Sequence, residues 1–174
     1  MKQVSMTHHF RLWGMPPRGS RLVIHHSRRS WSRSSTIAAI SSSGDHRFET
    51  YGNPVNGTRF SAFLESLPYP RGKTIILMDN IAFHKSAAVK NTAHEKGYEI
   101  IYTPPYSPWF NPIENVFSCI KGTFRKLNAH DILSASTSEK RSELICRSFH
   151  LSATPSAILS AFQHVEKLCK SNSI

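Results

Sequence analysis

The N-terminal part of the chain shows short apolar runs typical of β-strands. Runs at 21–26 and 36–41 predict two strands, and the alternation of apolar and polar residues at 46–51 predicts a third. A Ser-Ser-Ser-Gly-Asp turn joins the last two of them. Strands joined in this way pair with their neighbours, so we expect an antiparallel meander.

The middle of the chain changes to an alternation of helical and strand patterns. Apolar residues at helical spacing predict a crossover helix over 56–67. A run of five mostly apolar residues at 74–78 predicts a strand buried on both faces. A helix over 83–96, ended by Gly97, then leads to a strand over 98–102. Strand, helix and strand in this order predict a right-handed parallel unit.

The segment 103–111 contains three prolines and predicts a stiff loop, because proline and the residue before it resist regular structure. Asn111 is a suitable N-cap and Pro112 suits the first helical position. An apolar stripe continues this helix to about residue 127. The pattern therefore places Glu114 in the first turn of a helix.

The remaining residues, 128–174, predict two further helices near 138–149 and 155–170, the second capped by Thr154. The length fits one compact domain. We expect an α/β fold in which a mixed sheet combines an antiparallel meander with parallel strands. Helices flank this sheet, and the last two form a C-terminal helical appendage.

The charge of the chain favours a polyanionic partner. Its 174 residues include 22 Lys and Arg against 11 Asp and Glu, which gives a net charge of +11 and a pI of about 10.0. Residues 1–44 hold seven Lys or Arg and no acidic residue. Nucleic acid is the leading partner, and a solvated basic sheet edge is the alternative. The candidate contacts are Arg18, Arg21, Arg28, Arg29, Arg33, Lys85 and Lys121.

The three cysteines, Cys119, Cys146 and Cys169, are far apart and lack a C-x-x-C spacing, which argues against a disulfide framework or a zinc site. No apolar run is long enough for a membrane span, and the N-terminus lacks the apolar core of a signal peptide. We expect an intracellular protein without a membrane partner, in the nucleus if the host is eukaryotic.

Two carboxylates stand where a site is expected. Asp79 follows the predicted strand at 74–78, and 34 residues separate it from Glu114. Carboxylates on rigid elements suit divalent metal ions held against a phosphodiester. Structural roles compete: Asn111 and Glu114 fit a capping box, Asp79 and Asn80 fit a strand-end turn, and His84 fits a satisfied loop histidine.

Two longer motifs contain these residues. They are Met78-Asp79-Asn80-x-x-x-His84-Lys85-Ser86 and Tyr102-Thr-Pro-Pro-Tyr-Ser-Pro-x-x-Asn111-Pro-Ile-Glu114. Together they resemble the second half of the catalytic domain of the Tc1/mariner and IS630-like transposases, whose DD34E spacing matches Asp79 and Glu114. The resemblance extends from about Trp13 to about Lys126.

The resemblance implies a ribonuclease-H-like catalytic domain over 1–127, with 128–174 as its helical extension. It implies a DDE-superfamily endonuclease that cleaves and transfers DNA strands in transposition, with two Mg²⁺ or Mn²⁺ ions and no small-molecule cofactor. DNA is the expected partner, and a homodimer is possible in this family. Asp79 and Glu114 correspond to catalytic metal ligands, whereas Asn80, His84 and Asn111 correspond to motif positions without an assigned role.

Two departures from the family pattern stand beside the matches. The first catalytic Asp of the family has no counterpart, because the first acidic residue of this chain is Asp45, which lies in a Ser-Gly turn. Val4-Ser-Met-Thr7 resembles the strand that carries the family's first Asp, without the acidic residue. The family's N-terminal helix-turn-helix domain has no counterpart either. These departures favour a truncated, impaired transposase domain lacking its leading strand or first Asp. The alternatives are a catalytically inactive DNA-binding remnant and a basic interaction module unrelated to transposition.

Overall fold

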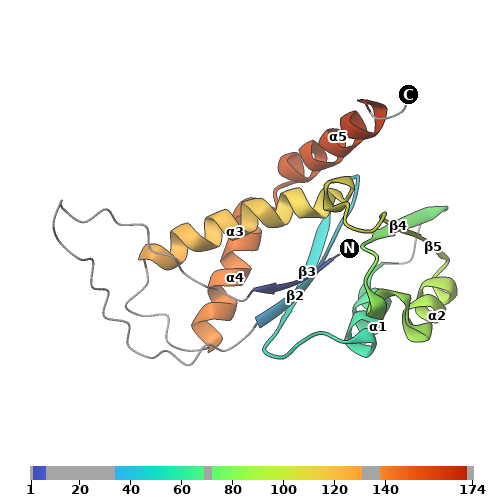
Figure 1. The fold of residues 1–174 in the computed structure, drawn as a ribbon. Helices are drawn as coiled ribbons and strands as arrows, with labels where there is room; N and C mark the ends of the chain where they lie inside the picture. Colours follow the sequence, from blue (N-terminus) through green and yellow to red (C-terminus); the bar gives the residue numbers. More distant parts are fainter. Residues whose placement is uncertain (1, 7–33, 69–71, 131–137, 172–174) are drawn as a thin grey trace.

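The structure is a computed structural model that describes residues 2–6, 34–68, 72–130 and 138–171 (Figure 1). The strand predicted at 21–26 and five candidate DNA contacts lie outside the described residues. Those five are Arg18, Arg21, Arg28, Arg29 and Arg33. Within the described residues the fold is α/β, as the sequence predicts.

The first sheet is antiparallel and has the order β1-β2-β3. It consists of β1 (Lys2–Met6), β2 (Ser34–Ile40) and β3 (His46–Tyr51), and in its register Ile37 lies opposite Gln3 on one side and Glu49 on the other. The strands predicted at 36–41 and 46–51 are confirmed. The sequence suggested that either the leading strand or its first Asp was lost. The structure has a strand, β1, ahead of β2, and its five residues include no acidic residue.

The second sheet consists of β4 (Thr74–Met78) and β5 (Tyr98–Tyr102), which are parallel, with Met78 opposite Tyr102. Both strands have the predicted bounds. The expected burial of β4 on both faces is wrong, because Ile75 is 50% exposed, and Ile101 of β5 is likewise 44% exposed. Successive side chains of a strand point to opposite faces, and the face that carries Ile76 packs in the core while the other does not.

The antiparallel and parallel strands form two sheets among the described residues, rather than the single mixed sheet that we expected. The two sheets nevertheless share one hydrophobic core. Ile37 from β2 packs in the same cluster as Ile76 and Met78 from β4. Side-chain packing, and not strand pairing, therefore joins the meander to the parallel pair.

Two helices complete this first core. Helix α1 (Gly57–Ser66) contributes Phe60 and Phe63, and α2 (Ala87–Glu95) contributes Val89. A 2.6 Å hydrogen bond between the hydroxyls of Ser61 and Thr92 links the two helices in the interior.

The helix predicted over 83–96 is not continuous. A 3₁₀ turn, η1 (Ala82–Lys85), comes first, and α2 starts only after Ser86, whose ψ of 151° is extended. The η1 turn places the His84 ring against Asp79 and Phe60.

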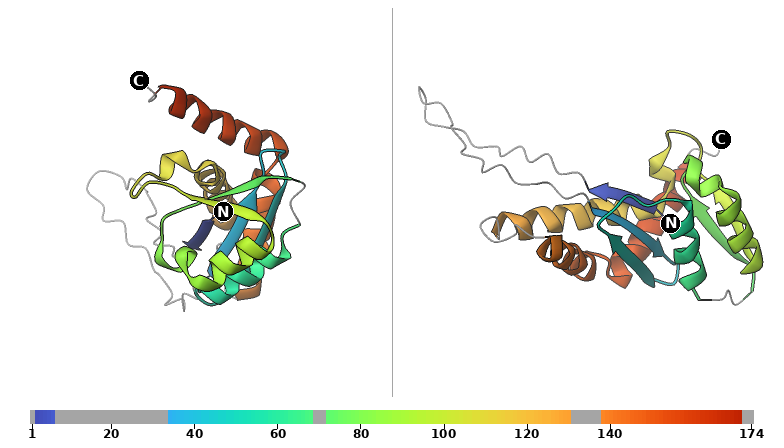
Figure 2. Two further views of the ribbon diagram at one scale, coloured as in Figure 1. Left: turned by 90° about the vertical axis from the view of Figure 1, so that its right-hand side faces the viewer. Right: turned by 90° about the horizontal axis from the view of Figure 1, so that it is seen from below.

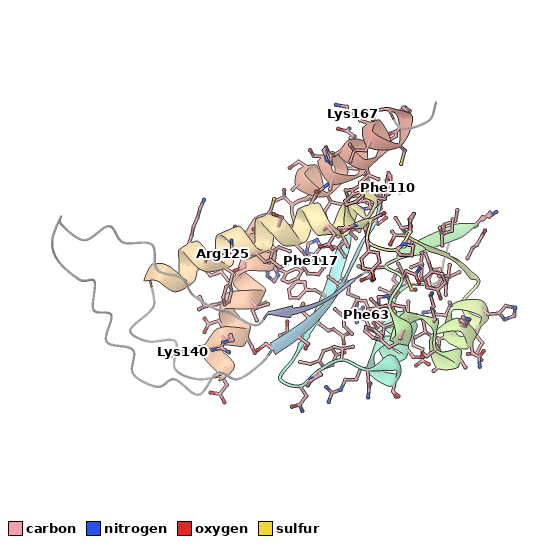
Figure 3. All side chains as sticks on the ribbon, viewed as in Figure 1. Phe63, Phe110, Phe117, Arg125, Lys140 and Lys167 are labelled. Atoms are coloured by element: carbon pink, nitrogen blue, oxygen red, sulfur yellow. The ribbon has the colours of Figure 1, made fainter. Side chains whose placement is uncertain are left out.

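The C-terminal helices build a second core. They are α3 (Pro112–His130), α4 (Ser138–Ser152) and α5 (Pro155–Ser171). Phe117 of α3 meets Phe149 of α4 edge to face at 5.9 Å, and Phe48 of β3 stacks on Phe149 at 4.2 Å. Figure 3 shows Phe63 and Phe117 in the two separate cores.

Helix α5 extends away from the rest of the protein (Figure 2). Its buried residues are Ile158, Ala161 and Val165, all in its first two thirds. At its start, Thr154 Oγ1 accepts from the backbone N–H of Ala157 at 3.3 Å, which confirms the predicted cap. Among the described residues, no helix combines the length and apolarity that crossing a membrane would require.

Candidate active site

Asp79 lies at the carboxyl edge of the parallel pair. It directly follows Met78, the last residue of β4, and the backbone N–H of Thr103 donates to Met78 O at 2.8 Å. This bond continues the pairing one residue beyond β5. Asp79 and the first residue of the loop that leads to Glu114 therefore share one sheet edge, which is where open α/β sheets place their ligands.

His84 is fully buried and contacts Asp79. Its Nδ1 lies 3.1 Å from the backbone oxygen of Asp79 and 3.0 Å from Oδ1 of the same residue, whose side chain is 20% exposed. The direction of the ring N–H favours the backbone oxygen as the acceptor, so Oδ1 is a close electrostatic contact beside that hydrogen bond.

Aromatic rings enclose the imidazole. The Phe60 ring lies 4.2 Å from it between centroids, and the Phe83 ring meets it edge to face at 4.5 Å. Tyr102 donates from its hydroxyl to His84 O at 3.1 Å, and the ammonium of Lys85 lies 5.7 Å above the Tyr102 ring. Burial raises the pKa of Tyr102, which keeps this hydroxyl a donor.

Sequence reasoning missed Tyr102 as a member of the site. The signal was available in the predicted parallel pairing, because two parallel five-residue strands in register place their last residues, Met78 and Tyr102, side by side. Phe60 gave no such signal, since its contact with His84 depends on how α1 packs.

The loop from Thr103 to Asn111 is held by its own hydrogen bonds. Its last part, η2 (Pro108–Phe110), is a 3₁₀ turn in which the N–H of Asn111 donates to Pro108 O at 3.0 Å. Asn111 itself is 2% exposed and extended, with φ −106° and ψ 109°. Its backbone oxygen accepts from the N–H of Glu114 at 3.1 Å, so Asn111 stands directly before α3 as predicted and Glu114 lies in the first turn.

The donor chemistry of this edge fits a hard divalent cation. Asp79 and Glu114 supply carboxylate oxygens, the ligand type that Mg²⁺ and Mn²⁺ prefer. Beside Asp79, the side-chain oxygen of Asn80 is buried without a hydrogen-bond partner among the described residues. Those residues contain no group of three or more His, Cys, Asp or Glu side chains close enough to hold a metal ion together. The described part thus offers one carboxylate at the end of β4 and another in the first turn of α3.

The remaining candidate DNA contacts and the upstream acid Asp45 lie on different elements. Lys85 is exposed at the site, and Lys121 is half-buried on α3. Asp45 lies in the turn between β2 and β3, where its carboxylate accepts from the Ser43 hydroxyl at 2.7 Å. Its hydrogen bond serves that turn.

The family model described as "DDE superfamily endonuclease" matches residues 7–135. The chain belongs to this family. The match includes both Asp79 and Glu114, and it confirms the resemblance that the two sequence motifs indicate.

A curated protein and two solved structures are similar to this chain. "Insertion element IS630 uncharacterized 39 kDa protein" of Shigella sonnei is 33% identical over 79 residues, which are 43% of this chain and 23% of the relative. The Mos1 mariner paired end complex with Mn has a TM-score of 0.68 at 16% identity, over 97% of this chain and 52% of that one. The Mos1 transposase catalytic domain with Raltegravir and Mn has a TM-score of 0.59 at 19% identity, over 82% and 77%.

These similarities show the ribonuclease-H-like fold of the transposase catalytic domains. The chain spans about a quarter of the curated relative and about half of the first Mos1 structure.

Proposed function

We propose that this chain is a DDE transposase domain that cleaves and transfers DNA strands, with Asp79 and Glu114 holding Mg²⁺ or Mn²⁺. The observation that carries the proposal is the shared sheet edge: the Thr103 to Met78 hydrogen bond joins the end of β4 to the loop that leads to α3. The family match covers this region. The Mos1 relatives include structures with Mn and with Mg, which supports the choice of cation.

Each residue has a defined task in this proposal. Asp79 and Glu114 present oxygen ligands from the end of a strand and the start of a helix, two elements whose backbones are fixed by hydrogen bonds. A bound divalent cation would offset the phosphate charge and activate the attacking hydroxyl. The N-terminus of α3 adds a positive dipole end beside Glu114, which favours the approach of a phosphate.

DNA is the proposed substrate and partner. The net charge of +11 favours a polyanion, and the Mos1 paired end complex and the Mos1 strand transfer complex are structural relatives. Lys85 is exposed and its ammonium lies 5.7 Å from the centre of the Tyr102 ring, so it supplies an accessible cation for a phosphate contact in this proposal. An intracellular location is part of the proposal, because the substrate is chromosomal or element DNA.

A plasmid-nicking assay tests the proposal. Purified protein is incubated with supercoiled plasmid in Mg²⁺, in Mn²⁺ or in chelator, alongside Asp79→Asn and Glu114→Gln, which keep the size of each side chain. Glu99→Gln is the matched control, because Glu99 is a carboxylate of β5 that pairs with Lys73 at 3.0 Å on the exposed face. We expect metal-dependent nicking in the wild type and in Glu99→Gln, and its loss in the other two variants.

The same assay separates the two candidate functions. Salt-sensitive DNA binding with no nicking above the Asp79→Asn background would support the inactive DNA-binding remnant instead. Nicking that persists in both Asp79→Asn and Glu114→Gln would exclude these carboxylates as the ligands.

A further inference from the structure

We propose that His84 is a positioning residue that fixes the Asp79 carboxylate for cation binding. The inference rests on the proposed function, because it takes Asp79 as a metal ligand. It starts from the two short distances that join the residues: Nδ1 of His84 is 3.1 Å from Asp79 O and 3.0 Å from Asp79 Oδ1.

These contacts determine which ring nitrogen carries the proton. A backbone oxygen can only accept a hydrogen bond, so Nδ1 of His84 must be the donor to Asp79 O. The other ring nitrogen, Nε2, is buried and has no hydrogen-bond partner among the described residues. The geometry assigns the Nδ1–H tautomer.

The surroundings of the ring prevent it from turning away. The side chain is 0% exposed and lies against Phe60 and Phe83 at 4.2 Å and 4.5 Å between centroids. Its own backbone is held by the Tyr102 hydroxyl at 3.1 Å. Rotation of the imidazole by half a turn would replace the Nδ1 donor by a carbon atom and lose the bond to Asp79.

The consequence is a carboxylate with a restricted rotamer. The Nδ1–H of His84 donates to the backbone oxygen of Asp79, and Nδ1 lies 3.0 Å from Oδ1 of the same residue. A ligand that is already oriented loses less conformational entropy when it binds a cation. Partners of metal ligands have measurable effects of this kind, and removing one typically weakens metal affinity about 10- to 100-fold.

Two substitutions separate the donor from the packing. His84→Asn keeps an amide N–H close to the position of Nδ1, whereas His84→Leu fills the pocket between the two phenylalanine rings without any donor. Mn²⁺ affinity is measured for the folded, full-length chain by titration calorimetry. DNA binding in chelator and thermal unfolding are measured in parallel. A purely structural role of His84 would lower the unfolding temperature as well as the metal affinity, whereas a positioning role lowers the metal affinity alone.

We expect His84→Leu to weaken Mn²⁺ binding about 10- to 100-fold with metal-free DNA binding retained, and His84→Asn to restore most of the affinity. Wild-type Mn²⁺ affinity in His84→Leu would overturn the proposal. Equal losses in both variants would also overturn it, because they would trace the effect to packing.

Nitrogen NMR of the imidazole in the wild-type protein provides a readout that needs no metal and no variant. The expected result is a ring with a proton on Nδ1, and a ring with its proton on Nε2 alone would overturn the proposal. This readout keeps the two proposals distinguishable. If Asp79→Asn leaves the Mn²⁺ affinity unchanged, the metal site of the proposed function is wrong. The position of the ring proton in the wild type still tests the contact between His84 and Asp79.

Discussion

The backbone N–H of Thr103 donates to Met78 O across the two parallel strands, at 2.8 Å. Because the bond lies one residue beyond β5, it fixes the start of the proline-rich loop beside Asp79. Thr103 is 5% exposed, so water could not easily replace its N–H as the hydrogen-bond partner of Met78 O. The bond therefore has both a structural and a positional role.

Thr103→Pro removes this N–H. We expect a loss of about 1 to 3 kcal/mol in the free energy of unfolding, measured by urea denaturation, together with reduced nicking. Thr103→Ser keeps the N–H and the hydroxyl and is the control, with nicking close to wild type. Full nicking activity in Thr103→Pro would show that the loop is positioned by other contacts.

The N-cap of α1 offers a purely structural prediction. Asn56 Oδ1 accepts from the N–H of Arg59 at 3.0 Å. Asn56→Ala should destabilise the protein by about 1 kcal/mol, and Asn56→Asp should retain the cap. Asn53→Ala, at an exposed asparagine in the preceding turn, is the control. Chemical denaturation checks the values, and equal stability of Asn56→Ala and wild type would contradict the assigned cap.

The second core depends on Phe117, which is 0% exposed between α3 and α4. Phe117→Ala removes its edge-to-face contact with Phe149 and leaves a cavity, so we expect a loss of about 3 to 5 kcal/mol. Leu151→Ala, at a 56% exposed position of α4, should change stability by less than about 0.5 kcal/mol. Similar effects of the two substitutions would be inconsistent with this core.

Alkaline pH should weaken the fold through Tyr51. Burial, together with the hydrogen bond to Glu49 at 2.6 Å, raises the pKa of Tyr51 to about 12. The ordinary value is about 10, so the folded state holds the proton more tightly than the unfolded chain. The contribution to stability is complete below about pH 10 and is lost as the pH rises from about 10 to about 12.

Urea denaturation at about pH 8 and about pH 11 measures this effect. The wild type should lose more stability between the two values than Tyr51→Phe, which has no phenolic proton. Tyr106→Phe, at a 97% exposed tyrosine, should follow the wild type. If Tyr51→Phe loses as much stability as the wild type, the raised pKa is not responsible.

The starts of β4 and β5 could be predicted because a glycine stands shortly before each strand. Gly72 lies two residues before β4, and Gly97, with φ +72°, adopts the left-handed conformation that ends a helix directly before β5. The interruption at Ser86 could not be predicted, because the sequence around it is compatible with a continuous helix. The exposure of Ile75 also depends on which face the helices cover.

The candidate site was predictable in part for the same reason. Asp79 follows an apolar strand and Glu114 follows an N-cap and a proline, so both positions are visible in the local sequence. The burial of His84 and the hydrogen bond from Tyr102 depend on the packing of α1 and on the register of β5. Those long-range features required the structure.

Paramagnetic broadening by Mn²⁺ in the amide NMR spectrum of the protein tests directly whether Asp79 and Glu114 hold a divalent cation. We expect selective loss of signals near Asp79, Asn80, Asn111 and Glu114, and no such loss in Asp79→Asn. Broadening centred elsewhere, for example at Cys146 and His150, whose Sγ and Nδ1 lie 3.6 Å apart on α4, would contradict it.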